Sequence, residues 1–225
     1  MKNTKTFFLT FSLLFSFVMF ACSNSGGNAV DKSATEKSKQ KEKKDLSKLS
    51  KAYFASGCFW CVEAIFESVE GVEEAVSGYA GGKEQNPTYE QVGRAQTGHT
   101  EAVEIYYDPA VISYETLLKV FYASHNPTTV NGQAPDFGTQ YRSAIFYMND
   151  AEKKMAESYK AKIASEYKKP IATEIAKLTQ FWDAEDYHQD FERKNPNQSY
   201  VRAVSVPRLN RFKAKYPELL KKSSH

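Results

Sequence analysis

The feature that most constrains the fold is one stretch that joins an aromatic strand to a helix carrying two thiols. Residues 52–66 read AYFASGCFWCVEAIF. A glycine follows the strand, Cys58 stands where the helix begins, and Cys61 follows three residues later. Unpaired backbone N–H groups and the positive end of the helix dipole favour a thiolate at such a position. The stretch therefore predicts a reactive dithiol at a helix N-terminus.

The spacing of the two cysteines allows them to oxidise together. Side chains three residues apart on a helix share a face, with Cβ atoms about 5–6 Å apart. That separation is close to the reach of a disulfide, and C-x-x-C in the first turn of a helix is a recurring redox arrangement. The alternative, ranked second, is that Cys58 and Cys61 are two small buried hydrophobic residues.

Length and charge limit the class of protein. The 225 residues suggest one domain with appendages, and the net charge of +3 is too small to indicate nucleic-acid binding. Lys2 and Lys5 contribute two of the positive charges and residues 31–51 contribute four more, so residues 52–225 carry a net charge of −3. We therefore expect a mildly acidic folded part and no nucleic-acid partner.

The N-terminus has the composition of a secretory signal. Two lysines precede an apolar run of 14 residues, Phe7 to Phe20. This run is shorter than the roughly 20 residues that a membrane-spanning helix needs. We predict a signal peptide over residues 1–21.

The residue after that segment is a candidate for lipidation. Ala21-Cys22 resembles the lipobox of bacterial lipoproteins, although a small residue is usual at the position of Phe20. We favour acylation of Cys22 over ordinary signal-peptidase cleavage, because an unpaired exposed thiol is a liability for an exported protein. Residues 22–50 would then be a lipidated Lys/Ser-rich flexible tether, and residues 51–225 the catalytic domain of a membrane-anchored protein of the cell envelope.

The order of strand and helix patterns predicts an α+β fold. Strands are expected over 52–56, 71–79, 99–107, 141–148 and 171–175. Helices are expected over 58–68, 113–122, from 149 or 150, over 184–194 and over 208–215, with Ser113 as one N-cap. We expect a ferredoxin-like two-layer α/β sandwich with a mixed sheet and a long irregular C-terminal segment.

Glu101 lies near the start of a predicted strand, on a face that is otherwise apolar. Alternation places Glu101 on the same side as Val103 and Ile105. If that face is buried, desolvation raises the pKa of Glu101 and makes it a candidate proton donor. Alternatively, the first residue of the strand projects into water. The pattern alone leaves both readings open.

The stretch around the dithiol resembles the signature of a known enzyme family. Residues 57–63, GCFWCVE, are similar to the signature of the class A peptide methionine sulfoxide reductases. Similarity continues over roughly residues 52–210, at 78–82, 86–89, 97–101, 107–109, 136–143, 184–189 and 194–196. The resemblance implies reduction of methionine-S-sulfoxide, free or in proteins, to methionine.

The resemblance also assigns roles to individual residues. Cys58 matches the nucleophile that attacks the sulfoxide sulfur, and Glu101 matches the acid that protonates its oxygen, which is otherwise a poor leaving group. Aromatic faces suit the S-methyl group of the substrate and exclude water. The matched substrate-binding residues are Phe59 and Trp60 for the methyl group, Tyr89 and Tyr141 for the oxygen, and Asp136 as a polar residue of the pocket.

The resemblance implies a sulfenic acid on Cys58, which condenses with a second thiol. Many family members use resolving cysteines near the C-terminus, but this sequence has no cysteine after Cys61. The implied intermediate is therefore a Cys58–Cys61 disulfide, reopened by thioredoxin or an equivalent dithiol. We expect a monomer without a bound cofactor or metal that repairs oxidised proteins.

Three other functions remain as alternatives. A general thiol–disulfide oxidoreductase would use the same dithiol without needing an acid at Glu101. A lipid-anchored binding protein would use the dithiol only structurally. A metal-binding module would need both cysteines and two histidines, although the histidines lack paired ligand spacing. The histidines considered are His99, His125 and His188.

Overall fold

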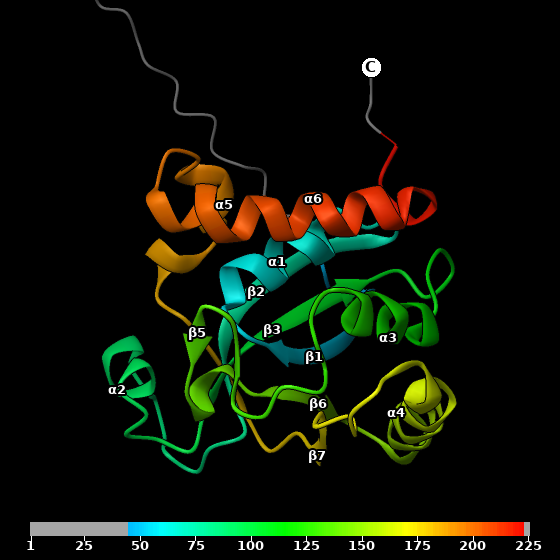
Figure 1. Cartoon of the computed structure of the whole chain (residues 1–225), viewed down its shortest axis with the longest axis horizontal. Helices are drawn as coiled ribbons and strands as arrows, with labels where there is room; N and C mark the ends of the chain where they lie inside the picture. Colours follow the sequence, from blue (N-terminus) through cyan, green and yellow to red (C-terminus); the bar gives the residue numbers. More distant parts are fainter. Residues whose placement is uncertain (1–44, 223–225) are drawn as a thin grey trace, which may run out of the picture. The chain divides into compact units, whose positions relative to one another are not determined.

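The computed structural model describes residues 45–222 (Figure 1). The predictions for the signal peptide, for lipidation of Cys22 and for the tether up to residue 44 lie outside the described residues. Within residues 45–222, none of the helices is both long and apolar enough to cross a membrane.

A six-stranded sheet forms the centre of the described part. Its strand order is β7-β6-β1-β3-β2-β8. All neighbouring pairs are antiparallel except β6 and β7, which are parallel, so the sheet is mixed as predicted. The strands are β1 (Ser50–Ser56), β2 (Val72–Ala80), β3 (Thr100–Tyr107), β6 (Ser143–Tyr147), β7 (Glu174–Lys177) and β8 (Phe181–Asp183).

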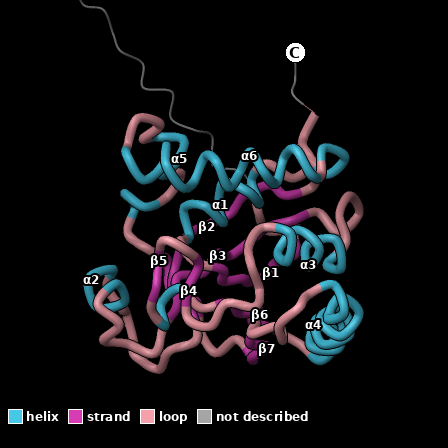
Figure 2. Tube along the Cα trace, viewed as in Figure 1, coloured by secondary structure: helices cyan, strands magenta, loops and turns pink. Residues whose placement is uncertain are grey.

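The two faces of the sheet are covered differently. Phe54 of β1 is fully buried, and its ring packs against Phe66 of α1 (Phe59–Glu67) and Phe121 of α3 (Tyr114–Ala123), with centroids 5.4 and 5.1 Å away. Burial of one such side chain stabilises a fold by about 1.5–3 kcal/mol. On the other face, Phe146 lies in a smaller cluster closed by the segment that leads into β8. The main core therefore lies under the helices (Figure 2).

The remaining helices frame this core. The predicted N-cap is confirmed: the Ser113 side chain accepts a hydrogen bond from Thr116 N at 3.1 Å. The helix expected from 149 or 150 has Asn149 as its N-cap, whose side chain accepts a hydrogen bond from Glu152 N at 3.0 Å. Asn149 opens α4 (Asp150–Ile163), and α6 (Val206–Lys215) lies along α1 (Figure 1). The shorter elements are α2 (Tyr89–Gly93), α5 (Phe191–Lys194), and the paired strands β4 (Gly132–Gln133) and β5 (Asp136–Phe137).

Several sequence predictions need correction. The strand expected over 171–175 begins at Glu174, because Ala172 N instead donates to Pro127 O at 2.7 Å. The helix expected over 184–194 is interrupted at Asp190, whose left-handed φ of +57° breaks it into a 3-10 turn and α5. The sequence patterns also missed α2 and β8.

Candidate active site

The turn before the dithiol depends on a glycine. Gly57 has φ of +85°, and a Cβ at this position would approach Gln133 Cβ to 2.9 Å. A larger residue would therefore meet both backbone strain and a steric clash. The turn delivers Cys58 to the N-cap of α1, as the sequence predicts.

The two thiols are reduced, buried and unequal. Cys58 is 7% exposed and Cys61 is 1% exposed. Burial, followed by the hydrogen bond with Cys61, raises the pKa of the Cys58 thiol well above its usual value. The hydrogen bond from Cys58 and the charge of Arg208 lower the pKa of Cys61 to about 6. Desolvation of Cys58 thus opposes the helix dipole, which by itself would favour a thiolate at this position.

A protonated carboxyl lies beside this pair. Glu101, at the start of β3, is 2% exposed, and its Oε2 accepts a hydrogen bond from Phe59 N at 3.0 Å. Burial raises the pKa of Glu101 to about 8, although the Phe59 hydrogen bond opposes the shift. The buried reading is confirmed, and at neutral pH this carboxyl is predominantly a proton donor.

Aromatic rings surround the start of α1. The Phe59 ring lies 6.3 Å from Tyr89 and 5.0 Å from His188, measured between centroids. The Trp60 ring stacks on Phe191 at 3.7 Å, and its Nε1 donates to His188 Nδ1 at 3.1 Å. The rings offer apolar faces to a small alkyl group, and their mutual contacts fix them in place.

The two predicted tyrosines are neutral hydroxyl donors. Tyr89 begins α2, and Tyr141 ends the 3-10 turn Thr139–Tyr141. Burial and the nearby Glu101 charge raise the pKa of both hydroxyls, that of Tyr89 to about 12. Both side chains are half-buried and can donate a hydrogen bond to an oxygen beside Glu101.

Asp136 is linked to the thiol pair through Tyr200, a residue to which the sequence analysis gave no role. The Tyr200 hydroxyl donates to Asp136 Oδ2 and lies 4.0 Å from Cys61 Sγ. The carboxyl of Asp136 is half-buried, and burial raises its pKa. The structure therefore brings all the predicted site residues within 45–222 into one neighbourhood.

Three further residues of this neighbourhood had no predicted role in the reaction. Glu185 accepts hydrogen bonds from the Tyr79 hydroxyl at 2.8 Å and from Tyr89 N at 2.9 Å, and so holds the start of α2. His188 contacts Phe59 and Trp60. The family similarity at 184–189 was the available sequence signal for both, whereas Tyr200 lies in a segment without a pattern.

The metal-binding alternative is not supported. His99 and His125 make their side-chain hydrogen bonds away from the thiols, for example from His125 to Phe121 O and Ser143 Oγ. In the part of the chain that the structure describes, the one group of three ligand-type side chains close enough to share an ion is Glu63, Glu67 and Asp190. That group contains neither cysteine.

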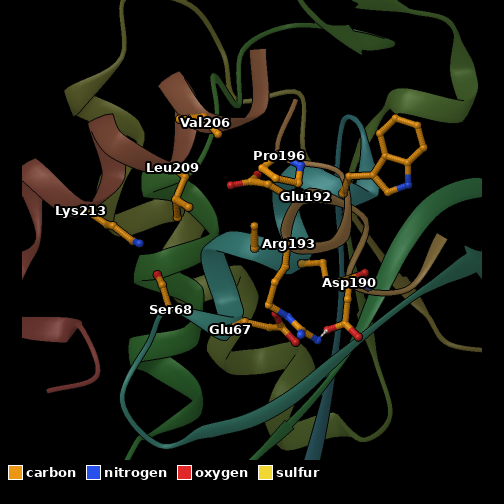
Figure 3. Close-up of a pocket in the computed structure, with 12 residues that line it drawn as sticks. Glu67, Ser68, Asp190, Glu192, Arg193, Pro196, Val206, Leu209 and Lys213 are labelled. Atoms are coloured by element: carbon orange, nitrogen blue, oxygen red, sulfur yellow. Dashed lines mark hydrogen bonds and ion pairs between the residues drawn. The ribbon is translucent and has the colours of Figure 1, made fainter. Parts of the chain in front are cut away.

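A cavity of about 350 Å³ lies between residues of α1 and residues of α6 (Figure 3). Arg193 points toward Asp190 on one wall, where the two side chains form an ion pair. The apolar wall includes Val206 and Leu209 of α6. Trp60 is part of its lining, whereas neither cysteine nor Glu101 lines it.

Comparisons with known proteins agree with the geometry. A sequence model of the family described as peptide methionine sulfoxide reductase matches residues 50–220. The chain is 49% identical over 172 residues to peptide methionine sulfoxide reductase MsrA 1 of Rhodopirellula baltica, covering 76% of this chain and 90% of that protein. It is 46% identical over 170 residues to MsrA of Pasteurella multocida, covering 76% and 98%.

Solved structures show the same similarity. Reduced Mxr1 from Saccharomyces cerevisiae superposes with a TM-score of 0.63 at 35% identity, covering 69% of this chain and 91% of that one. Methionine sulfoxide reductase A of Corynebacterium diphtheriae gives a TM-score of 0.61 at 34% identity, covering 67% and 77%.

Proposed function

The chain belongs to the peptide methionine sulfoxide reductase family, and we propose that it performs this reaction with Cys58 as nucleophile, Glu101 as acid and Cys61 as resolving thiol. It is thus a thiol-dependent oxidoreductase of the methionine sulfoxide reductase A type. One observation carries the assignment of roles. The buried Glu101 carboxyl is hydrogen-bonded to the backbone of the residue that follows Cys58.

In the first step, the sulfoxide sulfur of an S-epimer substrate faces Cys58. Phe59 and Trp60 hold its methyl group, and Tyr89, Tyr141 and Glu101 surround its oxygen. Cys58 transfers its proton to the Cys61 thiolate to which it is hydrogen-bonded, and its sulfur attacks the substrate. Glu101 protonates the oxygen, the substrate S–O bond breaks as the hydroxyl passes to Cys58 Sγ, and the bond between the two sulfurs breaks with its electron pair left on the substrate sulfur. The products are methionine and a sulfenic acid on Cys58.

In the second step, Cys61 resolves the sulfenic acid. Glu101, now a carboxylate, receives the proton of Cys61 and makes the thiolate available again. The Cys61 sulfur attacks Cys58 Sγ, the S–S bond forms, and the hydroxyl group leaves as water after protonation. The two thiols and the sulfoxide have then become a disulfide, methionine and water.

Recycling requires an external dithiol. Thiol–disulfide exchange with thioredoxin, or with an equivalent dithiol outside the cytoplasm, opens the Cys58–Cys61 bond. The buried but adjacent sulfurs at the start of α1 support this step, because they can pair with little movement of the helix.

Replacement of the resolving thiol tests the assignment. Cys61→Ser should produce about one methionine per protein and then stop when thioredoxin is the reductant, because the sulfenic acid has no partner. Wild-type protein should turn over repeatedly. Full multiple turnover by Cys61→Ser with this reductant would contradict the resolving role.

We place the enzyme at the cell envelope on the strength of its leader. The basic start, the apolar run and Cys22 support export and a lipid anchor, with residues 23–50 as a tether. Metabolic labelling with a fatty acid should mark the wild-type chain and not Cys22→Ser. Label in neither protein, or in both, would contradict the anchor at Cys22.

We also assign the core to the ferredoxin-like sandwiches. The support is the order β6-β1-β3-β2 within the sheet, with α1 between β1 and β2 and α3 between β3 and β6.

A further inference from the structure

One face of α6 presents a row of cations to a cavity of about 440 Å³. The lining includes Arg208, Arg211 and Lys215, whose spacing of three and then four residues places them on the same side of the helix. Arg208 is half-buried, whereas Arg211 and Lys215 are exposed. None of the three takes part in an ion pair within residues 45–222, so their charges are available to a ligand.

This cavity adjoins the proposed active site through two residues. Asp136 and Tyr200 line it, and the Tyr200 hydroxyl donates to Asp136 Oδ2 and lies 4.0 Å from Cys61 Sγ. Among the described residues of the lining, Asp136 is the one carboxyl group. His125 also lines the cavity and is neutral, because burial lowers its pKa to about 3. The wall beside the site therefore carries more positive than negative charge.

The opposite face of α6 differs in charge. Val206, Leu209 and Lys213 of that face line the cavity of about 350 Å³ (Figure 3). Carboxyl side chains outnumber cations in that lining, which contains Glu63, Glu67, Asp190 and Glu192 together with Arg193 and Lys213. The surplus of cations is therefore a property of the cavity that Asp136 and Tyr200 share, and not of α6 as a whole.

We propose that this cationic cavity binds acidic side chains that flank the methionine sulfoxide in a protein substrate. The inference rests on the proposed function, because it takes the oxidised methionine to lie at Cys58. The polypeptide on either side of that methionine must then cross the walls of the site, and an extended chain advances about 3.3–3.6 Å per residue. Side chains a few positions away thus meet a cavity that has Asp136 and Tyr200 in common with the site.

Cations in this position act on binding rather than on chemistry. An exposed pair of opposite charges changes a binding constant by about 1.5- to 5-fold. Salt weakens such a pair, because the Debye length falls from about 10 Å at 0.1 M to about 3 Å at 1 M. Arg211 and Lys215 have no part in the proton and sulfur transfers assigned to Cys58, Cys61 and Glu101, so the rate at saturation should not depend on them.

Two peptides that differ only beside the oxidised methionine test the proposal. One methionine-S-sulfoxide is flanked by Glu on both sides in the first peptide and by Gln in the second. Single turnovers of the reduced full chain, with no other thiol present, give the half-saturating peptide concentration and the maximal rate. At low salt the Glu peptide should saturate the wild-type chain at a concentration about threefold lower or less, and the difference should disappear in about 1 M salt.

The double variant Arg211→Gln, Lys215→Gln removes the two exposed cations. Its half-saturating concentration for the Glu peptide should rise by about three- to tenfold. The Gln peptide, the maximal rate and free methionine-S-sulfoxide, which has no flanking residues, should be unaffected. Arg208 stays in place, because its Nη2 donates to Ser56 O at 2.9 Å in the turn before Cys58. Circular dichroism checks folding, and the salt dependence of the wild-type chain tests the proposal without any variant.

Lys213→Gln is the matched control for Lys215→Gln, because it removes the same charge from the opposite face of the same helix. It should leave both peptides unaffected. Equal effects of Lys213→Gln and Lys215→Gln, or equal losses for the Glu and Gln peptides, would overturn the proposal. A charge effect seen only during recycling by thioredoxin, and not in single turnovers, would assign the cavity to the reductant and would also overturn it.

Binding measurements distinguish failure of this proposal from failure of the proposed function. Calorimetry with the same two peptides needs no reaction. Tighter binding of the Glu peptide, lost in the double variant, without any methionine formed would support the cationic cavity and contradict the reductase assignment. Reduction of both peptides with equal half-saturating concentrations at low salt would support the reductase and overturn the role of the cavity.

Discussion

Two buried carboxyls near α1 are alike in burial and in the direction of their pKa shift but differ in their hydrogen bonds. Glu63 of α1 and Glu101 of β3 are each 2% exposed, and burial raises the pKa of each to about 8. Both oxygens of Glu63 are bonded, one to Ser77 Oγ and one to Asp190 N. Glu101 accepts one hydrogen bond, from Phe59 N, and the residues that the structure describes leave its Oε1 without another.

The difference separates an anchor from the acid that we propose. Glu63 uses both oxygens to tie α1 to β2 and to the turn at Asp190, so it has no oxygen left for a substrate. Glu101 keeps one oxygen available and lies beside the thiol pair. Burial and a raised pKa therefore do not distinguish the two carboxyls, and our proposal for Glu101 rests on its available oxygen and on its position beside the thiols.

The largest effect is expected at the acid. Glu101→Gln keeps the size of the side chain and an acceptor for Phe59 N but cannot protonate the sulfoxide. The single-turnover rate of methionine formation should fall by about 100-fold or more. Glu63→Gln is the matched control and should lose much less. Equal losses in the two variants would break the distinction between acid and anchor.

The second-largest effect is expected on stability, where replacement of Glu63 should cost more than replacement of Glu101. Glu63→Ala leaves the Ser77 hydroxyl and Asp190 N–H without their partner and should cost about 1–3 kcal/mol of unfolding free energy. Glu101→Gln should cost less than about 1 kcal/mol because its hydrogen bond survives. Urea denaturation measures both. A larger loss for Glu101→Gln would contradict the comparison.

The pH dependence of stability tests the comparison of the two carboxyls further. A carboxyl whose folded pKa lies near 8, above the usual 4.5, holds a proton in the folded state that the unfolded chain has lost. Its contribution to stability is therefore complete below about pH 4.5 and is lost as pH rises toward 8. The stability deficit of Glu63→Gln relative to wild type should shrink over this window. A deficit that grows with pH would show that Glu63 is buried as an anion.

The smallest effect is expected at the partner of the anchor. Ser77→Ala removes one hydrogen bond to Glu63 and should cost about 1 kcal/mol. Activity should remain at the wild-type level, since Ser77 contacts neither thiol. Thermal unfolding and the multiple-turnover rate check both statements, and a loss of activity without a loss of stability would assign Glu63 to the chemistry.

The sequence predicted what local chemistry determines. The strand, glycine turn and helix over 52–66 follow from neighbouring residues, as does the N-cap at Ser113. The alternation in β3 placed Glu101 on a buried face but could not say whether its first residue was covered. The family resemblance supplied the role of that residue.

What the sequence missed depends on contacts between distant segments. Glu63 is bonded to Asp190, 127 residues away, and Arg208 is bonded to Ser56, 152 residues away. The sequence also missed the burial that raises the pKa of Cys58, because helix position is visible in the sequence and desolvation is not. The break at Asp190 has the same origin, since its backbone N–H turns toward Glu63.

Single-turnover mass spectrometry tests the central claim most directly. The reduced full chain is mixed with a methionine-S-sulfoxide peptide in the absence of any other thiol. We predict one methionine formed per protein and a protein lighter by two hydrogens, with the new bond located between Cys58 and Cys61. One oxygen gained on Cys58 without a disulfide, or no methionine formed, would contradict the account.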